Sequence, residues 1–157
     1  MKAFSVTLII VLVSGSVLGG TAPAGSDIAV VVSRDVPIDD LSFSELRKIL
    51  LGDRQYWSSS LRVTLLIRAP AARERDVILK NVLEMTEAQY RQYWIGKVFR
   101  AESSSGPKSI SSNEVAFSLL NSIPGSIAFV DASQVPKNLK VVRLGGLLPG
   151  DKGYPLN

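Results

Sequence analysis

The sequence predicts an α/β domain in which helices cover a mostly parallel, mixed sheet. Strand-like runs alternate along the chain with segments of helical spacing, which is typical of a sheet packed between helices. The strand-like run Ile28–Val32 is continuously apolar, and this pattern favours a strand buried on both faces. Residues 25–157 have the length of one ordinary domain, without an internal repeat. We therefore expect a single three-layer lobe over residues 25–144, followed by a tail.

The first 24 residues have the pattern of a secretory signal peptide. Lys2 precedes the strongly apolar run Ala3–Val13, and Ala22-Pro23-Ala24 has the small-x-small spacing that signal peptidase reads. The apolar run is shorter than the ~20 residues that a membrane span needs. Because the sequence has no cysteine, lipid attachment to the leader is not expected. We predict cleavage before Gly25, a periplasmic or secreted protein, and no stable membrane span after cleavage.

The first half of the domain predicts two strands and two helices. The strand over 28–32 is followed by Ser42-Phe43-Ser44-Glu45, a capping box that opens a helix. Gly52 lies just past the last apolar position of that helix and predicts its end. The apolar residues of 62–68 predict a second strand, and a helix is expected from beyond Pro70 to about residue 83.

The second half begins with a helix at Thr86, which forms a Thr-x-x-Gln capping box with Gln89. Residues 103–112 are polar and contain a Gly-Pro pair, so a loop is expected there. Ser111 and Glu114 predict a further capping box and helix. The remaining expectations are a strand over 126–130, a strand over 139–144, and an irregular, loose C-terminal tail over 145–157.

The composition excludes several classes of enzyme and metal protein. Without histidine or cysteine, Ser-His-Asp and Cys-His catalysis and zinc sites are not available. Ser105 and Lys108 match the Ser-x-x-Lys motif of serine acyl-enzymes, but Gly106 and Pro107 prevent the helical turn that this chemistry needs. We expect no enzymatic activity, no metal and no cofactor.

The charge of the chain bears on its partners. The formal net charge of +4 suits an anionic small ligand or an acidic partner surface. The basic residues are interleaved with acidic ones rather than gathered in a stripe, so nucleic acid is not an expected partner.

The junction between the second strand and the next helix is a candidate anion site. Arg68 ends the strand, and the first N–H groups of the helix and its dipole favour an anion beside it. Ligands of open α/β sheets also collect at the carboxyl ends of strands. The alternative is that Arg68 and Arg73 are surface residues paired with Glu74 and Asp76. The predicted ligand-binding residues are Arg68, Ala71, Ala72, Arg73, Ser109 and Ser111, of which the two serines are the weaker candidates.

Three segments together resemble a known family. They are the helix Leu41–Gly52 followed by Trp57, the strand that ends at Arg68, and the run Pro124–Val130. In this order they are similar to one lobe of the phosphate-type periplasmic substrate-binding proteins of ABC transporters. The family carries Ser-Gly-Thr where this chain has Ala71-Ala72-Arg73, so both hydroxyls are missing. The chain is also about half as long as a two-lobed binding protein.

This resemblance implies a periplasmic-binding-protein-like fold and two functional hypotheses. The first is binding of phosphate or a similar small oxyanion for transport or sensing, with an ABC transporter permease as partner. The alternative is a protein–protein interaction module that kept the lobe and lost the anion site. It would use a flat aromatic surface around Trp57 or Tyr93 to bind another periplasmic protein or form a homodimer. Helical spacing favours core packing for most of the aromatic residues, which are Trp57, Tyr90, Tyr93, Trp94 and Phe99.

Overall fold

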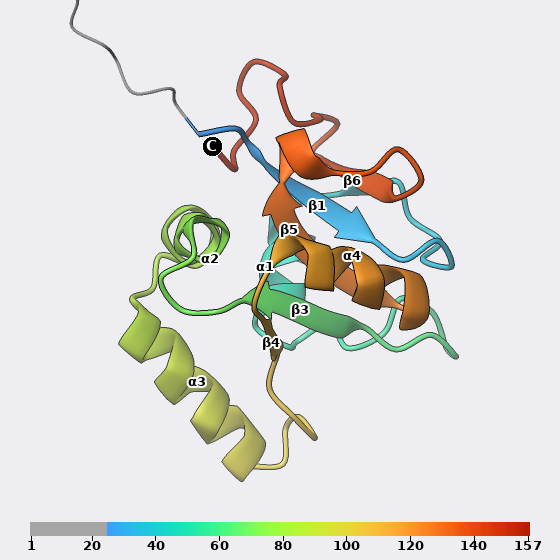
Figure 1. Ribbon diagram of the computed structural model, residues 1–157. Coiled ribbons are helices and arrows are strands. Elements are labelled where there is room, and N and C mark those ends of the chain that lie inside the picture. The colour runs from blue at the N-terminus through green and yellow to red at the C-terminus, as the bar shows by residue number, and fades with distance from the viewer. Residues whose placement is uncertain (1–24) are drawn as a thin grey trace, which may run out of the picture.

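The computed structural model describes residues 25–157, and the predicted leader and its cleavage site lie outside the described residues. The described residues form a mixed sheet with the strand order β2-β6-β1-β5-β3-β4 (Figure 1). β1 is antiparallel to both of its neighbours, whereas the other neighbouring pairs are parallel. All strands except β1 therefore run in one direction, which confirms the predicted mostly parallel, mixed sheet. The strands are β1 (Ile28–Val32), β2 (Asp40–Leu41), β3 (Thr64–Arg68), β4 (Lys108–Ile110), β5 (Ser126–Asp131) and β6 (Lys140–Leu144).

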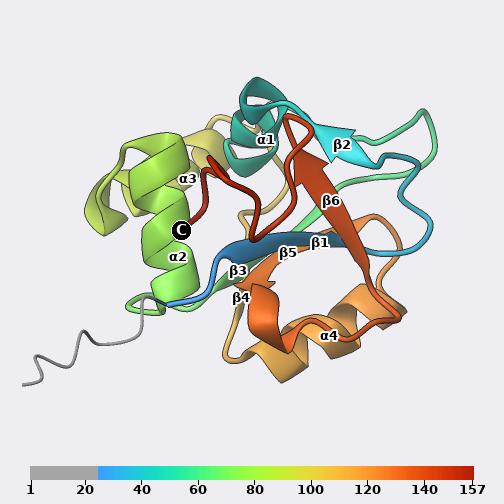
Figure 2. The ribbon, with the colours of Figure 1, turned by 90° about the horizontal axis from the view of Figure 1, so that it is seen from above.

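Helices cover both faces of the sheet, and the two sets bury separate apolar clusters. Figure 2 shows α4 on one face, with α1 and α2 on the other. The larger cluster joins alternate residues of β1 to α1, η1 and α3, and the smaller one joins the remaining β1 residues to α4. This is the predicted three-layer lobe. The helices are α1 (Phe43–Leu50), α2 (Arg73–Val77), its π-helical continuation η1 (Ile78–Leu83), α3 (Glu87–Phe99), α4 (Asn113–Ser122) and the 3₁₀ turn η2 (Ala132–Gln134).

β1 lies at the centre of the sheet, which explains its unbroken apolar sequence. Successive side chains of a strand point to opposite faces, and here helices cover both faces. All five residues of β1 are fully buried as a result.

Two of the three predicted capping boxes are confirmed. The Ser42 and Thr86 hydroxyls accept from backbone N–H groups, and Glu45 and Gln89 accept from the two cap N–H groups in return. The third prediction was wrong by one residue. Ser112, and not Ser111, caps α4 and accepts from the N–H of the residue three positions later. Ser111 instead belongs to the turn that follows β4.

Three further expectations need correction. The second strand begins at Thr64 rather than at residue 62, and the helix expected beyond Pro70 begins at Arg73 and becomes π-helical in its second half. The predicted loop over 103–112 contains β4, which pairs in parallel with β3. β4 is a three-residue edge strand in which only Ile110 is apolar, so its sequence carries no strand pattern.

The C-terminal segment is irregular in backbone but not loose. Tyr154 is buried, and Leu156 is fully buried in the larger apolar cluster. The Ile28 N–H donates to the Leu156 carbonyl at 2.7 Å, and the Tyr154 hydroxyl donates to the Ile28 carbonyl at 2.8 Å. The expectation of a loose tail was therefore wrong, because a segment without periodicity can still place single apolar residues in a core. Within residues 25–157, no helix combines the length and apolarity that crossing a membrane requires.

Candidate functional site

The candidate site lies at the edge of the sheet where β3 and β4 end. Arg68 is the last residue of β3 and is in register with Ile110, the last residue of β4. The chain enters α2 shortly after Arg68 and enters α4 shortly after Ile110. The two helices therefore begin beside the carboxyl ends of two parallel strands, where open α/β sheets bind ligands. The Arg68 side chain is 15% exposed.

The Arg68 guanidinium is held by groups from the first turns of both helices. Its Nη1 donates to a Glu74 carboxylate oxygen at 2.8 Å and to the Asn113 side-chain oxygen at 2.6 Å. Its Nη2 makes a long bond of 3.3 Å to the Ser111 carbonyl. The third donor, Nε, is buried and has no hydrogen-bond partner among residues 25–157. The site is thus a shielded cation with one intramolecular counterion and a buried, unused N–H at Nε.

Glu74 occupies a position that favours a carboxylate. It lies in the first turn of α2, where the helix dipole stabilises negative charge, and its side chain is only 10% exposed. From the sequence, the alternative was that Arg68 pairs with Glu74 at the surface. The structure confirms that the two residues pair, but it does not place the pair at the surface. The pair is largely buried rather than at the surface. No pair between Arg73 and Asp76 occurs in the part of the chain that the structure describes.

The other predicted site residues do not all gather around Arg68. Ala71 adopts a left-handed backbone conformation with φ of 69°, and the N–H of Ala72 already donates to the Ala69 carbonyl at 3.2 Å. Arg73 turns towards the start of the domain, where its Nη1 donates to the Ser26 carbonyl at 2.6 Å. The structure therefore brings Ser111 to Arg68 through its carbonyl, and it directs Arg73 elsewhere.

Ser109 is the remaining predicted residue. It is exposed on β4, in register with Ile67, and its hydroxyl makes no hydrogen bond to Arg68. Glu74 and Asn113 are the contacts that the sequence analysis did not place in the site. Asn113 is buried, and its amide nitrogen also donates to Gln134 at 2.9 Å. An asparagine at the start of a helix is common, so nothing in the sequence indicated that Asn113 also accepts a hydrogen bond from Arg68.

Arg75 ties the site to α3. It is buried, its Nη1 donates to the Arg68 carbonyl at 3.0 Å, and its other nitrogens donate to Glu87 at 2.6 and 2.7 Å. Its guanidinium also lies 5.5 Å from the centre of the Tyr90 ring. Burial of the Tyr90 hydroxyl raises its pKa, so this residue stays neutral at physiological pH. Arg75 thereby fixes the position of the Arg68 backbone.

Arg68 supplies this edge with a positive charge and with hydrogen-bond donors. The chain has no histidine or cysteine, and residues 25–157 contain no group of three or more carboxylates that could hold a metal ion. An anion that reaches Arg68 has to compete with the Glu74 carboxylate. In return it gains Nε, the donor that Glu74 leaves unused.

The fold is similar to one lobe of solved substrate-binding proteins of ABC transporters. Several solved structures of phosphate receptors align with this chain. An ABC-type phosphate transport receptor from Vibrio cholerae aligns with a TM-score of 0.64 at 17% identity, over 80% of this chain and 49% of that chain. PstS from Borrelia burgdorferi aligns with a TM-score of 0.63 at 17% identity, over 80% and 50%.

A phosphate ABC transporter substrate-binding protein with bound phosphate, from Clostridium perfringens, aligns with a TM-score of 0.60 at 18% identity, over 80% of this chain and 48% of that chain. The chain therefore spans about half the length of these structures. No family model and no curated protein matches it. The likeness confirms the fold that the sequence resemblance predicted.

Proposed function

We propose that this protein is a periplasmic, non-enzymatic binding domain for a small oxyanion of the phosphate type, and that Arg68 is its main charged ligand. The unused Nε of Arg68 is the observation that carries the proposal. A buried N–H of a charged group without an acceptor is costly. An oxyanion on the Nε side of the guanidinium would accept from both Nε and Nη2, which is the bidentate arrangement that guanidinium groups prefer.

Two further findings support the same function. The fold is shared with phosphate receptors of ABC transporters, and residues 1–24 have the pattern of a secretory signal peptide. We accordingly propose that an ABC transporter permease, or a sensor coupled to one, is the partner that recognises the domain when the anion is bound. The role of the second lobe in the longer proteins would then fall to that partner.

Calorimetric titration with inorganic phosphate and with sulfate tests the proposal. Glu74→Gln removes the charge that competes with the ligand, so this variant should bind the anion more tightly than the wild type. Arg68→Met in the Glu74→Gln background avoids leaving a buried carboxylate unpaired and should weaken binding by about 10- to 150-fold, the factor expected for charge-assisted hydrogen bonds.

The matched control is Arg143→Ala, because Arg143 is exposed on β6 and none of its side-chain atoms takes part in this site. It should leave affinity unchanged. Equal effects of Arg68→Met and Arg143→Ala, or no heat at millimolar phosphate and sulfate with any variant, would rule out an anion site at Arg68.

A second candidate function, an interaction module without a ligand, is favoured by one observation on α3. Phe99 is 90% exposed, and Ile95, one turn earlier, is 56% exposed. The aromatic surface expected around Trp57 or Tyr93 is not available, because Trp57 is buried and Tyr93 is partly buried. If α3 binds a second copy, sedimentation velocity should show a dimer that Phe99→Ser dissociates. A wild type that stays monomeric at high concentration excludes self-association through α3.

A further inference from the structure

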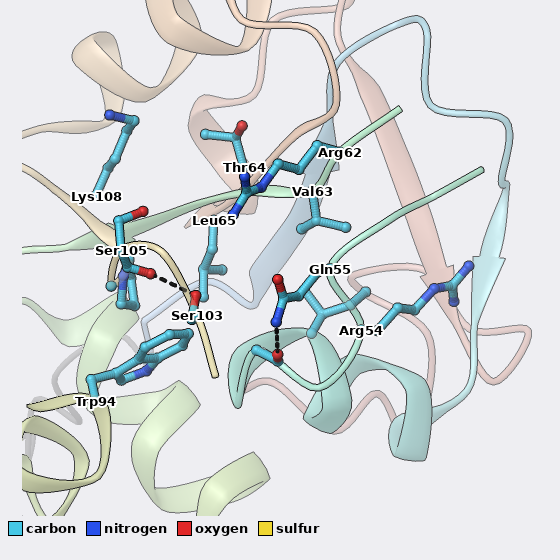
Figure 3. Close-up of a pocket in the computed structure, with 14 residues that line it drawn as sticks. Arg54, Gln55, Arg62, Val63, Thr64, Leu65, Trp94, Ser103, Ser105 and Lys108 are labelled. Carbon is cyan, nitrogen blue, oxygen red and sulfur yellow. Dashed lines mark hydrogen bonds between the residues drawn. The ribbon is translucent and has the colours of Figure 1, made fainter. Parts of the chain in front are cut away.

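A cavity lies at the opposite end of β3 from Arg68. It has a volume of about 110 Å³ and is enclosed by the turn after α1, the start of β3 and the loop that leads into β4 (Figure 3). Trp94 forms one wall, and Gln55 faces it from the turn after α1. Because β3 runs from Thr64 to Arg68, the strand separates this cavity from the Arg68 site.

The charge around the cavity is of one sign. Its lining includes three cations, Arg54, Arg62 and Lys108, and no acidic residue. Arg54 is already engaged, since it pairs with Glu45 at 3.2 Å and its head group points away from the cavity in Figure 3. Arg62 and Lys108 have no ion-pair partner in the described portion of the chain. Both positive charges are therefore uncompensated within residues 25–157, although the Lys108 head group extends away from the cavity in Figure 3.

The loop Ser103–Gly106 borders the cavity, and three of its residues, Ser103, Ser105 and Gly106, belong to the lining. The Ser103 hydroxyl donates to the Ser105 carbonyl at 2.9 Å, and Arg62 Nη2 donates to the Ser104 hydroxyl at 2.6 Å, so the loop has a defined shape. None of the four backbone N–H groups of this loop donates to an acceptor within residues 25–157. Successive free N–H groups beside cations are the usual elements of a protein anion site.

The wall formed by Trp94 gives the cavity a fixed size. Gly52 and Gly106 both line the cavity and lie against the ring, since an added Cβ would come within 2.5 Å of the indole at Gly52 and 3.9 Å at Gly106. A volume of about 110 Å³ corresponds to a few water molecules, each of which occupies ~30 Å³ in liquid water. It is too small for the organic ligands that occupy pockets of about 300–1,000 Å³.

We infer that this cavity binds a small inorganic oxyanion, independently of the anion site proposed at Arg68. Arg62 supplies the charge-assisted hydrogen bonds, the N–H groups of Ser103–Gly106 supply the directional ones, and Lys108 at the rim raises the local anion concentration. The inference goes beyond the proposed function, because it needs neither Arg68 nor a partner lobe.

Amide NMR of the purified ¹⁵N-labelled protein separates the two sites in one titration. With sodium sulfate added at constant ionic strength against sodium chloride, the amide signals of Ser103–Gly106 and the Trp94 indole should shift and saturate. Arg62→Gln should weaken this effect by about 10-fold or more, as the loss of a charge-assisted pair implies. Arg91→Gln is the matched control, because Arg91 is an exposed arginine on α3 outside the cavity lining.

Signals of residues 72–74 and 111–113 report on the Arg68 site and should be unaffected by Arg62→Gln. If only these signals respond to sulfate, the cavity does not bind the anion, whatever the outcome at Arg68. Loop shifts that rise linearly to tens of millimolar without saturating, or that are the same in Arg62→Gln and the wild type, would also overturn the inference. Saturable loop shifts in an Arg68→Met/Glu74→Gln protein would support it even if the proposed function fails.

Discussion

Removing both members of the Arg68–Glu74 pair should destabilise the fold by less than the sum of the two single removals. The two side chains are 15% and 10% exposed, and the N–O distance is 2.8 Å. Breaking a buried pair by removing one partner costs about 3–5 kcal/mol. Because water reaches part of this pair, we expect about 2–3 kcal/mol for Arg68→Met or Glu74→Gln.

Each single variant leaves a polar group without its partner. For this reason the losses in free energy of unfolding should not simply add in the double variant. In Arg68→Met the Glu74 carboxylate stays in a largely buried place without its cation, and the Asn113 side-chain oxygen loses a donor. The double variant Arg68→Met/Glu74→Gln leaves no unpaired charge. Its free energy of unfolding should therefore exceed the value expected from adding the two single losses by about 1–3 kcal/mol, a usual range for residues in contact.

Urea unfolding followed by tryptophan fluorescence measures these free energies. Both tryptophans of the chain, Trp57 and Trp94, are buried and will report the transition. Single losses below about 0.5 kcal/mol that simply add would mean that Arg68 and Glu74 behave as an exposed ion pair. The description of a shielded cation with an intramolecular counterion would then be refuted.

Three further predictions concern the rest of the lobe. Leu156→Ala should cost about 2–5 kcal/mol in urea unfolding, because Leu156 is fully buried, whereas Lys152→Ala in the same segment should cost almost nothing; equal small losses would restore the loose tail. Gly125→Ala should cost at least about 3 kcal/mol, since φ is +71° and a Cβ would lie 2.0 Å from the Arg62 carbonyl oxygen; a thermal melt within a few degrees of wild type would contradict this. Burial alone would raise the pKa of Asp35, but hydrogen bonds from a serine hydroxyl and from the Gly125 N–H hold this pKa below its usual value. The resulting stability is complete above the unfolded-state pKa of ~3.9 and is lost as pH falls through the lower folded-state pKa, so Asp35→Asn should lose less stability below about pH 4 than the wild type; parallel pH profiles would argue against it.

The elements that were predicted correctly are those whose sequence signal is local. The capping boxes at Ser42 and Thr86 depend on residues three positions apart, and the central strand β1 shows its burial directly as five apolar residues. β4 and the C-terminal segment were missed for the opposite reason. Their positions depend on partners far along the chain, β3 for the first and Ile28 for the second.

The same distinction applies to the site. Arg68 at the end of a buried strand could be inferred from its position, and Glu74 was available as a partner six residues later. The contact with Asn113 joins residues 45 positions apart and follows only from the parallel pairing of β3 with β4. Because that pairing has no sequence pattern, the full set of groups around Arg68 could not be predicted.

The central position of β1 also determines when the lobe can fold. β1 is made first, but both of its sheet neighbours, β5 and β6, lie near the other end of the chain, and Ile28 bonds to residue 156 as well. Contacts between such distant residues form late, because closing a long loop must precede any gain from pairing. Until residues 126–157 are available, the most apolar strand has no partner. A chain with this order cannot complete its sheet until residues 126–157 have been made.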